Sequence, residues 1–138
     1  MKEMIKQIIK EEMFRSMKKY YFLSGLPMSG QNIISVVLKQ NPAFVVSNSS
    51  PVLDLMIGTE QILNANPSFA AYPDQESGYR MVSSVIDTYY KNTEQNLIID
   101  RNNSWPAFTH YIKGYMDEVP KIVCAVRDMS EVLSLIHI

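Results

Sequence analysis

Residues 20–41, YYFLSGLPMSGQNIISVVLKQN, decide the fold of this chain because they predict a strand, a turn and a helix in immediate succession. Residues 20–23 are aromatic and apolar, as is typical of a buried parallel strand. Gly25 and Gly30 bound a tight turn, and the helix that begins near Gln31 carries Ile33, Ile34, Val37 and Leu38. Such a turn leaves backbone N–H groups free at the positive end of a helix dipole, so it predicts a site for phosphate or sulfate.

The turn departs from the pattern of nucleotide hydrolases. The spacing from Gly25 to Gly30 matches G-x-x-x-x-G-K-[ST], but Gln31 and Asn32 stand where that pattern has Lys and Ser or Thr. Without the Lys there is no point charge for the outer phosphates, and without the hydroxyl there is no direct ligand for Mg²⁺. Hydrolysis of ATP or GTP is therefore disfavoured, and the sequence predicts an anion-binding turn.

Two separated motifs resemble the sulfotransferases. The segment Gly25-Leu26-Pro27-Met28-Ser29-Gly30, with Ile33-Ile34 and Gln40-Asn41-Pro42 after it, is similar to their 5′-phosphosulfate loop, usually G-L-P-R-S-G. The apolar strand at 121–126 runs into Arg127-Asp128, and in the family that Arg holds the 3′-phosphate of the donor, 3′-phosphoadenosine 5′-phosphosulfate (PAPS). The resemblance implies a three-layer α/β fold with a doubly wound parallel sheet, similar to P-loop nucleoside-triphosphate hydrolases and truncated at the C-terminus. It also implies PAPS as co-substrate and no required metal.

The resemblance also implies the roles of individual residues. The backbone of residues 27–32 would hold the 5′-phosphosulfate, Ser29 or Asn32 would donate to its bridging oxygens, and Arg127 would hold the 3′-phosphate. Met28 stands where the family has a basic residue, and the missing contact would cost about 1.5 to 3 kcal/mol. The implied donor-binding residues are Gly25, Pro27, Met28, Ser29, Gly30, Gln31, Asn32 and Arg127.

The sequence does not identify a catalytic base. In related sulfotransferases that act on protein tyrosine, a glutamate near the second strand-to-helix junction is the base, but residues 47–50 are Ser-Asn-Ser-Ser here. Capping a helix and turning the chain is the favoured role of these serines, with contact to an acceptor as the alternative. Asp100 and Arg101 follow a strand and are candidates for the site, unless they pair with each other. His110 lies in a predicted helix, where a structural or solvated role is favoured over that of a base.

Two functions from different classes stay open. The first is a sulfotransferase that transfers a sulfuryl group from PAPS to a hydroxyl or amine acceptor, which the sequence does not name. The second is a non-catalytic or degenerate nucleotide- or anion-binding module, or an inactive fragment, as Met28 and the missing base indicate. A phosphotransferase of the P-loop class, which would need Mg²⁺, is a distant third.

Composition and charge exclude several other classes. The chain has 138 residues, 46% of them hydrophobic and 20% charged, which is typical of one globular domain. Its net charge of −1 does not mark a nucleic-acid or membrane-surface binder, and no apolar run reaches the roughly 20 residues of a membrane span. Cys124 is the single cysteine, so no internal disulfide forms. Its apolar strand predicts a core position, and we expect a reducing, cytoplasmic location.

The rest of the chain alternates strands and helices. Strands are predicted at 44–46, 96–100 and 121–126, and helices at 105–118, at 76–90 and from Pro51 to about residue 64, with Ser50 as the N-cap of the last. Residues 65–75 contain two prolines and predict a connecting loop or lid. This order implies a parallel sheet with helices on both faces.

The two ends of the chain differ from this central unit. Residues 1–16 predict an amphipathic helix that packs on the domain edge and is dispensable, since Met17 is an alternative natural start. We expect residues 17–132 to form part of a sulfotransferase-like donor-binding domain. Residues 133–138, LSLIHI, match one reading frame of a transposon adapter used in DNA library preparation. We therefore expect a metagenomic reading frame whose natural sequence ends near Val132, and no functional role for His137.

Overall fold

The computed structural model describes residues 1–136, apart from the side chains of Glu11, Glu12 and residues 14–17. Its centre is a four-stranded sheet in the order β2-β3-β1-β4, and every described strand pair is parallel. The strands are β1 (Lys19–Gly25), β2 (Phe44–Val46), β3 (Leu97–Arg101) and β4 (Ile122–Ala125). The predicted α/β class with a parallel sheet is therefore confirmed.

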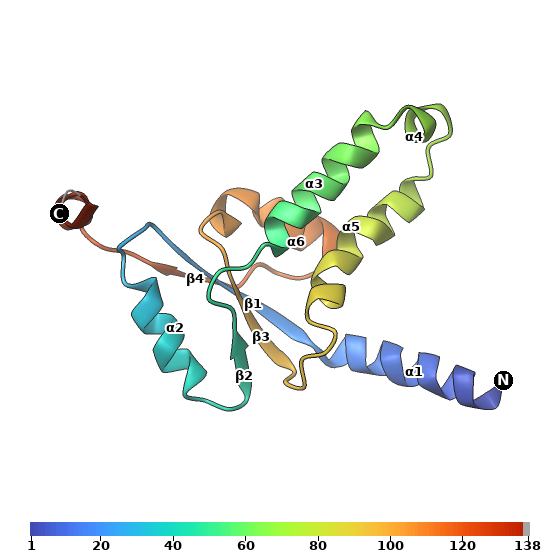
Figure 1. Ribbon diagram of the computed structural model, residues 1–138, viewed down its shortest axis with the longest axis horizontal. Helices are drawn as coiled ribbons and strands as arrows, with labels where there is room; N and C mark the ends of the chain where they lie inside the picture. Colours follow the sequence, from blue (N-terminus) through green and yellow to red (C-terminus); the bar gives the residue numbers. More distant parts are fainter. Residues whose placement is uncertain (137–138) are drawn as a thin grey trace.

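Helices flank the sheet on both faces (Figure 1). The chain connects the strands through α2 between β1 and β2, α3 to α5 between β2 and β3, and η1 with α6 between β3 and β4. The bounds are α1 (Lys2–Met17), α2 (Gln31–Lys39), α3 (Val52–Ala65), α4 (Pro67–Ala71), α5 (Gln75–Tyr89), η1 (Trp105–Phe108), α6 (Thr109–Tyr115) and α7 (Met129–Ile136).

Two apolar cores lie on opposite faces of the sheet because successive side chains of a strand alternate in direction. Phe22 and Ile98 belong to the larger core, which contains buried residues of α3, α5, η1 and α6. Leu23 and Ile99, the next residue along each strand, belong to the smaller core with partly buried residues of α2. The layers are therefore helix, sheet and helix.

Two predicted elements differ in detail. The expected loop at 65–75 contains the short helix α4, whose start is capped by Asn66: its side chain accepts hydrogen bonds from the N–H groups of Ser68 and Phe69. The helix expected at 105–118 is divided into η1 and α6 and ends at Tyr115. Beyond it Asp117 has a φ of 50°, a left-handed conformation that does not continue a helix.

The predicted core position of Cys124 is wrong, because its side chain is exposed. β4 is the last strand of the described sheet, so its outer edge has no neighbour among residues 1–136. On α2, Ile34 and Leu38 pack on the smaller core, whereas Ile33 and Val37 are 72% and 58% exposed, so only half of the expected apolar face is buried.

The N-terminal helix forms as predicted, but its apolar stripe is not packed on the domain edge. Met4, Ile5, Ile8 and Ile9 are all about half exposed, and Figure 1 shows α1 extending away from the sheet. None of the helices described is both long enough and apolar enough to cross a membrane. Residues 133–136 continue α7, and His137 lies outside the described residues.

Candidate functional site

The turn that follows β1 lies at the carboxyl edge of the sheet. The chain leaves β1 for β2 on one side and leaves β3 for β4 on the other, so the direction of winding reverses between the neighbouring strands β1 and β3. In open parallel sheets, ligands bind at such a switch point, beyond the carboxyl ends of the strands. Gly25 ends β1, Arg101 ends β3, and Arg127 follows β4, so these three residues reach the same edge.

The turn keeps several backbone donors unoccupied. The N–H of Ser29 donates to the Leu26 carbonyl at 3.1 Å, and the N–H groups of Ile33 and Ile34 both donate to the carbonyl of Gly30. Gly30 has a φ of 96°, which turns the chain into α2 and which glycine adopts without steric cost. Within residues 1–136, the N–H groups of residues 30–32 donate no hydrogen bond, so the start of α2 offers free donors to an anion.

Gly25 allows the turn to pack closely on the sheet. A Cβ atom at this position would lie 2.5 Å from Ser29 Oγ and 3.0 Å from both the Cβ and the carbonyl oxygen of Ala125. Ser29 Oγ is therefore under the turn, where it is buried and has no hydrogen-bond partner in the described structure. Of the two expected side-chain donors to bridging oxygens, only the exposed Asn32 faces solvent, and Ser29 does not in this conformation.

The side chain of Gln31 also lies inside the turn. It is 5% exposed, and its Nε2 donates to the carbonyls of Gly25 and Leu26 at 3.2 and 3.3 Å. Its Oε1 accepts a hydrogen bond from Arg101 Nε at 3.2 Å. Gln31 can therefore offer a ligand its backbone N–H but not its carboxamide. The sequence carries no signal for this inward position, since a polar residue at the start of a helix is usually solvated.

Arg127 follows β4 and contacts the turn. It belongs to the second of the two motifs that resemble the sulfotransferases. Its Nη1 donates to the carbonyl oxygen of Met28 at 3.2 Å, across 99 residues of sequence. Its Nε pairs with Glu131 Oε2 at 3.1 Å. The Met28 side chain itself is 56% exposed, so the position that is basic in the resembling family is open to solvent.

Within residues 47–50, Ser47 and Ser50 accept hydrogen bonds from the backbone, but Ser50 is not the N-cap of α3 that was predicted. Ser47 Oγ accepts from the N–H of Arg101 at 2.7 Å, and Ser50 Oγ accepts from the N–H of Val52 at 3.1 Å. Pro51 is the N-cap of α3, so the helix begins one residue later than predicted. These hydroxyls stabilise the strand-to-helix junction, and no carboxylate occurs among the four residues.

Asp100 and Arg101 do not pair with each other, so one of the two predicted alternatives is excluded. Asp100 is fully buried and accepts hydrogen bonds from Tyr90 Oη at 2.6 Å and from Trp105 Nε1 at 2.8 Å. Burial raises the pKa of the Asp100 carboxyl, and its hydrogen bonds oppose that shift. Asp100 therefore connects β3 with η1 and with the end of α5, whereas the Arg101 side chain contacts Gln31 at the start of α2. No pattern in the sequence indicated either aromatic partner.

The raised pKa predicts a pH dependence of stability. The folded chain keeps a proton on Asp100 at pH values where the unfolded chain has released it. The contribution of Asp100 to the free energy of unfolding is thus full below about pH 4 and is lost as the pH rises through the raised pKa. We expect Asp100→Asn, whose amide still accepts from Trp105 and donates to Tyr90, to lose less stability than the parent chain as the pH rises above about 4. Urea unfolding at several pH values measures this difference, and parallel stability curves would contradict it.

A separate cavity of about 530 Å³ lies at the amino end of β1, away from the turn. Lys18, Tyr20 and Asp87 line it, and they hold one another and α5 in place: Tyr20 Oη donates to Asp87 Oδ1 at 2.7 Å, and Lys18 Nζ donates to the carbonyl of Tyr90. Burial lowers the pKa of the Lys18 ammonium, and the charge of Asp87 opposes this shift. These contacts stabilise the junction of β1 with α5.

Comparison with known proteins gives no family for the chain: no protein-family model matches it, and no curated protein is significantly similar. In the part of the chain that is described, His, Cys, Asp and Glu side chains form no group of three or more that could hold a metal ion. The assignment of function therefore depends on the turn and the residues around it.

Proposed function

We propose that the chain is the donor-binding part of a sulfotransferase, and that the turn at residues 25–30 binds the 5′-phosphosulfate of PAPS. The observation that carries the proposal is the contact between Arg127 Nη1 and the carbonyl of Met28. It joins the two motifs that resemble the sulfotransferases at one edge of the sheet. The free N–H groups of residues 30–32 supply the donors that a tetrahedral anion needs.

In this proposal the residues of the turn act on the donor. The N–H groups at the start of α2 hold the oxygens of the 5′-phosphate and the sulfate, and Arg127 pairs with the 3′-phosphate. The acceptor oxygen or nitrogen then forms a bond to sulfur, the bond between sulfur and the bridging phosphate oxygen breaks, and the acceptor proton passes to a base. The 3′-phosphoadenosine 5′-phosphate left behind is the second product. No metal is part of this scheme.

A cytoplasmic location belongs to the same proposal. Cys124 is exposed and forms no disulfide, and a reducing compartment keeps such a thiol free. The acceptor, a hydroxyl or an amine, is left open because no described residue selects between them.

A second candidate is a non-catalytic module that binds an anion or a nucleotide. Two observations favour it. The exposed side chain at position 28 is the uncharged Met28, where the resembling family has a basic residue. At the junction where a catalytic carboxylate would be expected, Ser47 Oγ and Ser50 Oγ accept hydrogen bonds from the backbone. Such a module would share the binding site of the first candidate and lack the transfer step.

The substitution Met28→Arg tests the two candidates. Adding a cation at an exposed position of the turn is expected to tighten the binding of 3′-phosphoadenosine 5′-phosphate by one to two orders of magnitude, from about 1.5 to 3 kcal/mol of charge-assisted hydrogen bonding. Titration calorimetry measures this change, with Arg127→Ala as the variant that should weaken binding. Tighter binding by Met28→Arg without sulfuryl transfer to any of a panel of phenols and amines would favour the non-catalytic module. Unchanged affinity in both variants would count against a donor site at this turn.

A further inference from the structure

Gln31 and Arg101 form a connected chain of hydrogen bonds beneath the turn. The Gln31 amide bridges the carbonyls of Gly25 and Leu26 on one side and Arg101 Nε on the other, with distances of 3.2 to 3.3 Å. Arg101 Nη1 also lies 3.5 Å from Ser35 Oγ, which donates to the carbonyl of Gln31 at 2.9 Å. Gln31 and Ser35 are 5% and 2% exposed, so these contacts are shielded from water.

The chemistry of the partners permits one orientation of the Gln31 amide. Two backbone carbonyls can only accept, so they require the NH₂ group, and a guanidinium can only donate, so it requires the oxygen. Both carbonyls are thereby engaged on the inner side of the turn. An amide of the opposite orientation would place its oxygen against the two carbonyl oxygens and its NH₂ group against the Arg101 Nε–H.

We propose that Arg101, acting through Gln31, is a positioning residue that holds the turn in its anion-receiving form; the consequence for ligand binding rests on the proposed function. The carbonyl oxygens of Gly25 and Leu26 would repel an anion if they faced the start of α2, and the Gln31 amide keeps them occupied. Arg101 supplies the donor that keeps this amide in place, from the neighbouring strand β3.

The same contacts indicate the class of ligand. Where a Lys at position 31 would bring a charge to the outer phosphates, this chain has a neutral amide directed inward, and the cation of Arg101 lies behind it. The anion is therefore held by backbone N–H groups, without the Lys and hydroxyl that serve Mg²⁺-bound nucleoside triphosphates. A phosphate or sulfate ester that binds without a divalent metal fits this site.

Two substitutions at Arg101 separate positioning from direct attraction of the ligand. Arg101→Gln keeps a neutral donor at the position of Nε for Gln31 Oε1, whereas Arg101→Met extends only as far as that position with apolar atoms and removes the donor. We expect Arg101→Met to weaken the binding of 3′-phosphoadenosine 5′-phosphate about tenfold, and Arg101→Gln to stay within about threefold of the parent chain. Titration calorimetry measures both.

A second readout needs no ligand. The N–H groups of Ile33 and Ile34 donate to Gly30 at the junction of turn and helix. We expect Arg101→Met, and not Arg101→Gln, to speed their hydrogen exchange, measured by NMR, about tenfold, with unchanged exchange in β1.

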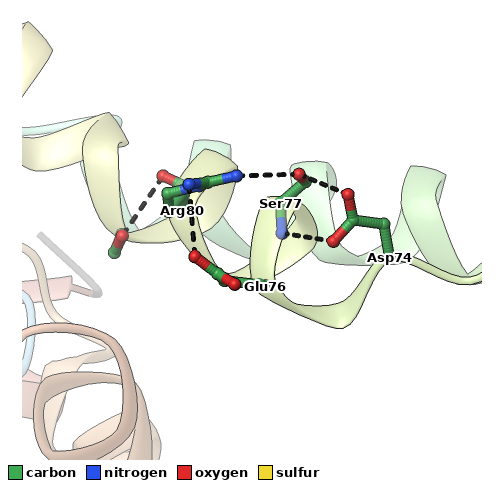
Figure 2. A network of polar contacts seen from close by, with 5 residues as sticks. Asp74, Glu76, Ser77 and Arg80 are labelled. Carbon is green, nitrogen blue, oxygen red and sulfur yellow. Dashed lines mark hydrogen bonds and ion pairs between the residues drawn. The ribbon is translucent and has the colours of Figure 1, made fainter.

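Arg80→Met is the matched control. Arg80 lies on α5, where its guanidinium contacts Glu76 Oε1 at 3.2 Å and Ser77 Oγ at 3.0 Å (Figure 2). The same substitution there removes an arginine and its hydrogen bonds without touching the turn, so neither the affinity nor the exchange of Ile33 and Ile34 should change.

Equal losses of affinity in Arg101→Met and Arg101→Gln would overturn the inference, because Arg101 would then act by its charge. Unchanged exchange at Ile33 and Ile34 in Arg101→Met would overturn it as well. If the parent chain does not bind the nucleotide but Arg101→Met still speeds this exchange, the positioning of the turn is supported and the proposed function fails.

Discussion

Replacing Trp105 by alanine is expected to cost about 3 to 5 kcal/mol of the free energy of unfolding. The indole is fully buried in the larger core, with its ring centroid 4.4 Å from that of Phe22. Its Nε1 donates to Asp100 at 2.8 Å, so the substitution opens a cavity and also removes one donor from a buried carboxyl. Domains of this size have about 5 to 15 kcal/mol of stability in total.

Urea unfolding followed by circular dichroism measures this loss. Trp105→Phe keeps most of the contact with Phe22 and lacks the donor to Asp100, so it should cost about 1 to 3 kcal/mol. Tyr72→Ala is the control for truncating an aromatic side chain at the surface, because Tyr72 is 86% exposed, and it should change stability by less than about 0.5 kcal/mol. A cost below about 1 kcal/mol for Trp105→Ala would contradict the position of the indole in the core.

The second large effect is expected at Gly25, where a methyl group does not fit. The added Cβ would meet Ser29 Oγ at 2.5 Å, and the carbonyl of Ala125 at 3.0 Å cannot turn away because it belongs to β4. We expect Gly25→Ala to lose about 1 to 3 kcal/mol of stability through overpacking. The displaced turn should also bind 3′-phosphoadenosine 5′-phosphate at least about tenfold more weakly, a loss of about 1.4 kcal/mol.

Gly58→Ala is the matched control for this substitution. Gly58 lies inside α3, and a Cβ there would meet no atom within 4 Å. Because alanine favours a helix over glycine, we expect this variant to gain about 0.5 to 1 kcal/mol and to bind the nucleotide unchanged. Parent-like stability and affinity in Gly25→Ala would show that the turn does not need its close approach to β4.

Local patterns sufficed for the order of strands and helices. The aromatic and apolar run before Gly25, the apolar spacing from Ile33 onward and the helix start near Ser50 each depend on neighbours in sequence, and each predicted element forms. The short helix α4 was not predicted, because two prolines indicated a loop and the cap at Asn66 was missed. The layers followed from the alternation of strands and helices.

What the sequence could not supply were contacts between distant residues. The inward position of Gln31 depends on Arg101, 70 positions away, and the burial of Asp100 on Tyr90 and Trp105. The exposure of Cys124 follows from the place of β4 at the edge of the sheet, which its apolar composition did not indicate. In the candidate site, the glycines and Arg127 could be predicted from a resemblance, while the buried hydroxyl of Ser29 could not.

The measurement that tests the central claim most directly is a calorimetric titration of the folded chain with 3′-phosphoadenosine 5′-phosphate, beside an equal titration with ADP and Mg²⁺. The free N–H groups of residues 30–32 and the guanidinium of Arg127 at the turn predict that the first ligand binds without metal and that ADP with Mg²⁺ does not bind. Binding of ADP with Mg²⁺ alone, or of neither ligand by a chain that still melts cooperatively, would contradict a sulfuryl-donor site at this turn.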